Sequence, residues 1–113
     1  MPTVNIYAAT ATLGNDVAEI SDDLATTIAT SLSTSGGLLD GAHVSLRVFI
    51  PNRSFMIAPI ELEITAHAFP ERVERQDEIC GELRAWLERR LASECRVWLS
   101  LNQLGYGYKA VSG

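Results

Sequence analysis

The sequence lacks the features that mark several large classes of protein. Its two cysteines, Cys80 and Cys95, are too few for a disulfide framework and have no zinc-ligand spacing. His43 and His67 lie far apart without neighbouring ligand residues, so we expect no metal site. No apolar run reaches the roughly 18 residues that cross a bilayer. No basic segment followed by an apolar run opens the chain, so we expect a cytoplasmic protein without a membrane partner.

The chain also lacks an excess of basic residues. It has 9 Lys and Arg against 14 Asp and Glu, a formal net charge of −5. A general nucleic-acid binder needs a basic patch that neutralises phosphates, and none is expected here. A small anionic substrate remains compatible with this charge, because two or three local arginines can override it.

The first half predicts a strand at 3–9, a helix at 17–34 and a strand at 43–50. The helix has one apolar face, made by Val17, Ile20, Leu24, Ile28 and Leu32. Gly36 and Gly37 end it, as expected where a chain enters the left-handed conformation. In the second strand, apolar residues alternate with Ser45, Arg47 and Phe49.

The second half predicts the same order of elements. Apolar residues alternate with Glu61 and Glu63 in a strand at 58–68. Pro70 suits the first turn of a helix that extends to about residue 92. The exposed side of this helix carries Glu71, Arg72, Glu74, Arg75 and Glu78. A last strand follows at 95–102.

The order βαββαβ predicts an α+β fold in a single domain, residues 1–113, with pseudo-repeats at about 2–51 and 57–104. Right-handed crossovers place both helices on one face of a four-stranded sheet. Tyr7, Phe49 and Trp98 then lie on the other face, which association with further subunits would cover. An unrelated ferredoxin-like module has the same element order and remains an alternative.

Pro2 follows the initiator Met1 and precedes the first strand. Proline at this position normally permits removal of the methionine, which leaves a secondary amine at the end of a strand. Such an amine acts as a general base where its surroundings keep it neutral near pH 7.

An N-terminal proline on a strand, two βαβ units and this length resemble the tautomerase superfamily. Its members include macrophage migration inhibitory factor and 5-carboxymethyl-2-hydroxymuconate isomerase. The resemblance implies a homotrimer whose two halves are joined by parallel strands, and it gives Pro2 the role of catalytic base. The segment 45–50 is similar to a strand whose arginine binds and polarises the substrate's acid group, which implies that role for Arg47.

Four further positions follow from the resemblance. The segment 96–100 looks like a strand that lends a tyrosine and an asparagine to a neighbouring subunit's site, and here Trp98 and Ser100 occupy those places. Gly37 replaces a lysine of the cytokine-like members. Arg72 falls near a substrate-binding arginine of the hydroxymuconate isomerase, although a solvated helix face is the competing interpretation.

The resemblance implies a cofactor-independent keto–enol tautomerase or isomerase acting on a small carboxylated 2-oxo or 2-hydroxy-unsaturated acid. Proton transfer by Pro2 and charge stabilisation by arginine need no metal or cofactor. One alternative is a non-catalytic binding or signalling protein of the same fold. Another is a hydratase or dehalogenase that uses a charged Pro2 and a carboxylate, for which Glu61 and Glu63 are candidates. These two glutamates otherwise lie at a wet edge or pair with arginines across the sheet.

Overall fold

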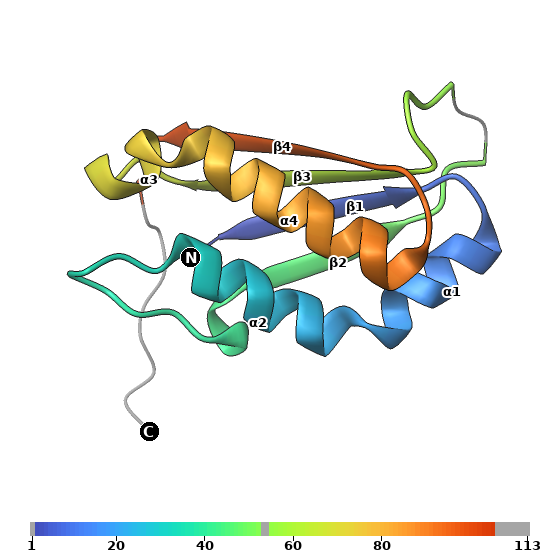
Figure 1. Ribbon diagram of the computed structural model, residues 1–113, viewed down its shortest axis with the longest axis horizontal. Coiled ribbons are helices and arrows are strands. Elements are labelled where there is room, and N and C mark those ends of the chain that lie inside the picture. The colour runs from blue at the N-terminus through green and yellow to red at the C-terminus, as the bar shows by residue number, and fades with distance from the viewer. Residues whose placement is uncertain (1, 53–54, 106–113) are drawn as a thin grey trace.

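Two strand–helix–strand units form one mixed sheet in the computed structural model, which describes residues 2–52 and 55–105 (Figure 1). Within these residues the sheet has four strands in the order β2-β1-β3-β4. The first unit comprises β1 (Thr3–Ala8), α1 (Ala11–Glu19), α2 (Ser21–Leu32), a short 3-10 turn η1 (Gly41–His43) and β2 (Ser45–Phe49). The second comprises β3 (Ile60–His67), α3 (Pro70–Glu74), α4 (Gln76–Leu91) and β4 (Cys95–Asn102).

Each of the two predicted helices is divided into a pair. The first begins earlier than predicted because Thr10 caps it, its side chain accepting a hydrogen bond from the Leu13 amide at 3.2 Å. Ile20 interrupts this helix and Arg75 interrupts the second, each with φ near −100° and ψ near +10°. Among the described residues, no helix is both long and apolar enough to span a membrane.

The strand pairing separates this fold from a ferredoxin-like module. In each unit the two strands are adjacent and parallel, β1 with β2 and β3 with β4. A split βαβ unit would instead place another strand between them. The expectation that parallel strands join the halves is wrong, because β1 and β3 are antiparallel. The α+β class and the four-stranded sheet with helices on one face are confirmed (Figure 1).

One sheet face packs against the helices and forms the core. Alternate residues of β1 and β3 point into it and are fully buried, as the strand periodicity requires. From the helices, the fully buried residues are Val17, Leu24, Ile28, Ala29, Leu32, Ile79, Leu83 and Leu87.

The opposite face is open in the single chain, as predicted. Tyr7 and Phe49 stack on it with ring centroids 5.3 Å apart, and Trp98 is 46% exposed. One row of side chains crosses all four strands of this face, from Arg47 through Asn5 and Glu63 to Trp98. Trp98 therefore ends a row that is otherwise polar, and the aromatic groups do not form a continuous apolar surface.

Candidate functional site

The topology brings four segments to one end of the sheet, where strands begin or finish. β1 begins there, and α2 ends there because it returns antiparallel to β1 (Figure 1). β3 runs antiparallel to β1, so it finishes at this same end of the sheet, and α3 begins immediately after it. Residues from both halves of the chain can therefore surround the residue that precedes β1.

That residue is Pro2, which is buried. Its carbonyl oxygen accepts a hydrogen bond from the Ser45 amide at 3.0 Å, which fixes it between β1 and β2. Pro2 lines a cavity of about 510 Å³, a size that suits a small ligand. The other lining residues are Thr34, Ser35, Gly36, Gly37, Leu39, Phe69, Pro70, Glu71 and Arg72. Met1 lies outside the described residues.

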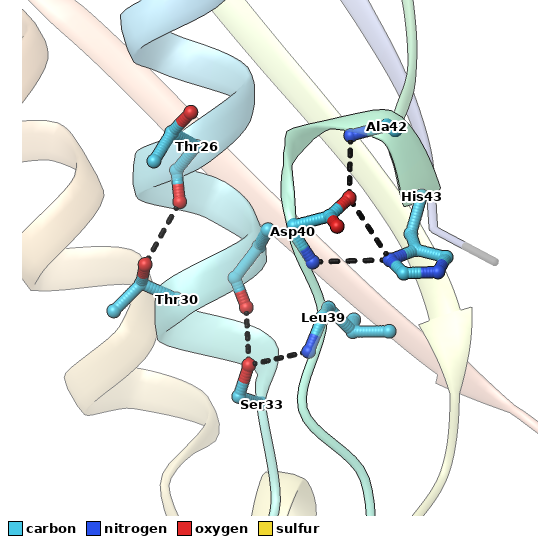
Figure 2. Close-up of polar contacts among 8 residues, drawn as sticks. Thr26, Thr30, Ser33, Leu39, Asp40, Ala42 and His43 are labelled. Atoms are coloured by element: carbon cyan, nitrogen blue, oxygen red, sulfur yellow. Dashed lines mark hydrogen bonds and ion pairs between the residues drawn. The ribbon is translucent and has the colours of Figure 1, made fainter.

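The connection between α2 and β2 forms one wall of this cavity. It begins at Ser33, whose hydroxyl donates to the Ala29 carbonyl at 2.8 Å and accepts from the Leu39 amide at 3.0 Å. It ends at η1, where Asp40 accepts from the Ala42 amide at 2.9 Å, as Figure 2 shows. These bonds pin both ends of the connection, so its cavity-lining part is held by the fold.

Within this connection, Thr34 and Gly37 form a tight turn. Their backbones exchange two hydrogen bonds, of 2.9 and 3.1 Å. The predicted left-handed glycine is wrong, because neither Gly36 nor Gly37 has a positive φ. Helix α2 ends instead with Ser33 in an extended conformation. Gly37, which stands where the resemblance places a lysine, does line the Pro2 cavity.

Arg72 lines the cavity from α3 and is only 6% exposed, so the interpretation as a solvated helix face is wrong. Its Nε donates to the Leu32 carbonyl at 2.8 Å and one terminal nitrogen donates to the His67 carbonyl at 3.1 Å. The guanidinium carbon lies 4.8 Å from the Phe69 ring centroid. Arg72 thus joins the end of α2 to the end of β3 and fixes a cation in the cavity wall.

Glu71 brings a carboxylate to the same cavity. Its two oxygens accept from the Ser35 amide at 3.2 and 3.0 Å, and Oε1 also accepts from the Ser35 hydroxyl. The hydroxyl bond, followed by the amide bond, holds the pKa of Glu71 below its usual value. The cavity wall therefore contains an anion as well as the cation of Arg72.

No family model and no curated protein sequence matches the chain. A solved member of the cis-3-chloroacrylic acid dehalogenase family matches with a TM-score of 0.65 at 7% identity, covering 89% of this chain and 75% of that one. A 5-carboxymethyl-2-hydroxymuconate delta-isomerase matches with a TM-score of 0.60 at 17% identity, covering 100% and 89%.

A macrophage migration inhibitory factor-like protein from Entamoeba histolytica matches with a TM-score of 0.56 at 14% identity, covering 96% of this chain and 95% of that one. All three belong to one superfamily. This chain has the tautomerase-superfamily fold. At these identities the likeness establishes the fold, and the chemistry must be argued from the residues.

In this tautomerase fold, three of the predicted site residues lie away from the Pro2 cavity. Arg47, Trp98 and Ser100 all point to the open sheet face. Arg47 donates to the Asn5 side-chain oxygen at 3.5 Å, and Asn5 donates to Glu63 at 3.1 Å. Within one chain the structure therefore brings Pro2 together with Arg72 but not with the other three.

The two glutamates proposed for water activation have structural contacts. Glu63 belongs to the row on the open face, linked to Arg47 through Asn5. One Glu61 oxygen accepts from the Ile57 amide at 2.8 Å and from the Ala58 amide at 3.3 Å. Neither lines the Pro2 cavity. In the described part of the chain, no group of three or more His, Cys, Asp or Glu could hold a metal ion.

Sequence reasoning missed the contribution of Ser35, Phe69 and Glu71 to the cavity. Two signals were present: Gly36-Gly37 marked the end of the first long helix, and Pro70 marked the start of the second. Because the halves are joined by antiparallel strands, both of these segments lie at the end of the sheet where Pro2 lies. The incorrect expectation of parallel joining concealed this.

Proposed function

We propose that this protein is a cofactor-independent keto–enol tautomerase or isomerase. Its substrate is a small carboxylated 2-oxo or 2-hydroxy-unsaturated acid, and Pro2 is the general base after removal of Met1. The observation that supports this most strongly is the burial of Pro2 in the wall of a cavity of about 510 Å³ that Arg72 also lines.

The apolar part of the wall around Pro2 favours a neutral amine. A free α-amine has a pKa of about 7.7–8.0 in model peptides. Leu39, Phe69 and Pro70 add apolar surface to the cavity, and burial of this kind disfavours the charged form of an amine. A base of this type takes a proton from the carbon next to a carbonyl group and returns it at another carbon.

The intermediate of this reaction carries negative charge on an enolate oxygen. Arg72 supplies a permanent cation in the wall, which stabilises such a charge by its field. In the proposed homotrimer, Arg47, Trp98 and Ser100 act on the cavity of a neighbouring copy, since they lie on the open face of their own chain. A solution mass of one chain, measured by light scattering, would contradict this arrangement.

The decisive test compares two prolines in the same chain. Protein shown by intact mass to begin at Pro2 is expected to ketonise phenylenolpyruvate or 2-hydroxymuconate, and Pro2→Ala to lose roughly 100-fold or more in kcat/KM, the scale of general base catalysis. Pro59 also precedes a strand but its nitrogen is always an amide, so Pro59→Ala is the control.

Retention of Met1 gives a second control, because it acylates the Pro2 nitrogen and leaves the rest of the sequence unchanged. Methionine-bearing protein is expected to be as inactive as Pro2→Ala. Absence of turnover in the processed protein, with Pro2→Ala indistinguishable from it, would instead favour a non-catalytic binding protein of the same fold.

One observation favours a second candidate, the hydration or dehalogenation of an unsaturated acid by a charged Pro2. Glu71, not Glu61 or Glu63, places a carboxylate in the cavity of Pro2. The pH dependence of kcat/KM separates the two: activity that rises with pH through the pKa of Pro2 indicates a neutral base, and activity that falls indicates the charged form.

A further inference from the structure

Glu71 occupies a fixed position in the Pro2 cavity. The amide and hydroxyl of Ser35 both bind its carboxylate, and Ser35 itself lines the same cavity. The turn that contains Ser35 is closed by the bonds between Thr34 and Gly37. The carboxylate therefore cannot leave the wall without breaking its contacts with a loop that is itself held in place.

Glu71 is also an anion under ordinary conditions. The hydrogen bonds from Ser35 favour the charged form and lower the pKa of this carboxyl group. A molecule that enters the cavity meets one fixed negative charge at Glu71 and one fixed positive charge at Arg72. Both residues come from α3, but Glu71 is held by Ser35 and Arg72 by the Leu32 and His67 carbonyls, so the two charges have separate positions in the wall.

We propose that Glu71 makes the Pro2 cavity selective for acids with one carboxylate over acids with two. This inference rests on the proposed function only in that the substrate enters this cavity. The first carboxylate of a ligand is attracted by Arg72, whereas a second one is repelled by Glu71. Because Glu71 is exposed, water screens the repulsion, and we expect a selectivity of about five-fold and not a strict exclusion.

The test replaces Glu71 by the neutral amide of the same shape. In Glu71→Gln, the ratio of kcat/KM for 2-hydroxymuconate, a dicarboxylate, to that for phenylenolpyruvate, a monocarboxylate, is expected to rise about five-fold. High salt should raise this ratio more in the unaltered protein than in Glu71→Gln, because only the unaltered protein has the Glu71 charge to screen. Glu74→Gln, an exposed glutamate on α3 that does not line the cavity, is the matched control.

Equilibrium binding separates this inference from the proposed function. Calorimetry measures the affinity of the Pro2→Ala variant, with and without Glu71→Gln, for two unreactive acids, 3-phenylpropanoate and adipate. A shift of about five-fold toward adipate supports the role of Glu71 even if no substrate turns over.

Three results would overturn the inference. The first is an affinity ratio that Glu71→Gln leaves unchanged, and the second is the absence of binding of both acids. The third is an equal loss of turnover for both substrates in Glu71→Gln, since that would assign the carboxylate to the reaction itself and not to selectivity.

Discussion

The two halves of the chain have the same elements but build different surroundings for corresponding prolines. Pro2 precedes β1 and Pro59 precedes β3. The Pro2 carbonyl accepts a hydrogen bond from Ser45 in β2 of its own half, and the Pro59 carbonyl accepts one from Ala9, just after β1 of the other half. The helical segments of both halves are broken at residues with nearly identical backbone angles, Ile20 and Arg75. The two halves thus share this backbone detail as well as their order of strands and helices.

The halves differ in how the long helix returns to the sheet. In the first half, residues 33–44 connect α2 to β2, whereas residues 92–94 suffice between α4 and β4. The longer connection supplies the loop wall of the Pro2 cavity, and α3 of the second half supplies the charged residues. The cavity therefore arises from a departure from the repeat, together with a contact between the halves.

The opposite end of the sheet shows what the repeat provides without that connection. The cavity beside Pro59 measures about 310 Å³, and its described lining is uncharged: Ala9, Met56, Ile57, Ala58 and Pro59. The nearby Glu61 is occupied with the amides of residues 57 and 58. Both ends thus have a proline before a strand, and the charged wall distinguishes the Pro2 end from the other.

The largest effect on stability is expected from Arg72, whose hydrogen bonds link the two halves at the Pro2 end. Arg72→Met removes the donors to the Leu32 and His67 carbonyls while it keeps much of the side-chain volume. The His67 carbonyl keeps its bond from the Phe69 amide, but the Leu32 carbonyl loses a buried donor, which costs about 1–3 kcal/mol of unfolding free energy. Urea denaturation of the two proteins measures this loss.

The control for that variant is another arginine of the same helical segment. Arg75 forms ion pairs with Glu78 at 3.2 Å and Glu82 at 3.7 Å, and its side chain is 40% exposed. Surface ion pairs contribute at most about 1 kcal/mol, so Arg75→Met should change stability less than Arg72→Met. Equal effects would mean that Arg72 does not hold the halves together.

Much of the fold could be predicted because strand periodicity is a local signal. The strand at 95–102 was predicted with its observed bounds, and the alternation around Glu61 and Glu63 correctly separated the buried face from the open one. The division of each helix was missed because Ile20 and Arg75 are ordinary helical residues. Their break depends on how two helical segments pack on a twisted sheet, which no local pattern encodes.

Less of the candidate site could be predicted, because it depends on contacts between the halves. Pro2 was identified from its place in the chain alone, and Arg72 was named although its burial was not expected. Ser35 and Glu71 are 36 positions apart and meet only because β1 and β3 are antiparallel. In the proposed homotrimer, the position of Arg47, Trp98 and Ser100 relative to a cavity depends on a second copy, which one sequence cannot place.

A smaller effect on stability is expected after the two long helices. An alanine has the left-handed conformation that favours glycine after α4, whereas the glycines after α2 do not have it. Ala92 ends α4 with φ of 49°, and no described glycine has a positive φ. Ala92→Gly should raise stability by about 0.5–1 kcal/mol, because it relieves a left-handed alanine at some entropic cost. Gly36→Ala should not destabilise, since an added Cβ would meet nothing within 4 Å. Thermal melting of both variants checks this, and a large loss of stability in Gly36→Ala would contradict the turn between Thr34 and Gly37.

The smallest expected effect concerns the contact between Ser35 and Glu71, which links the longer connection of the first half to the second half. The folded state lowers the pKa of Glu71 from its ordinary value of 4.5, so the ionised carboxylate favours folding. This stabilisation is fully present above 4.5 and is lost as the pH falls through the lowered value. The difference in urea midpoint between the unaltered protein and Glu71→Gln should therefore stay constant from pH 7 to about pH 5 and shrink at more acid pH.

Ser35→Ala should reduce the same pH dependence, because the hydroxyl bond is the largest cause of the shift. A difference that does not vary with pH would show that the loop is held at the Pro2 end by the turn and by Ser33 alone, without the carboxylate.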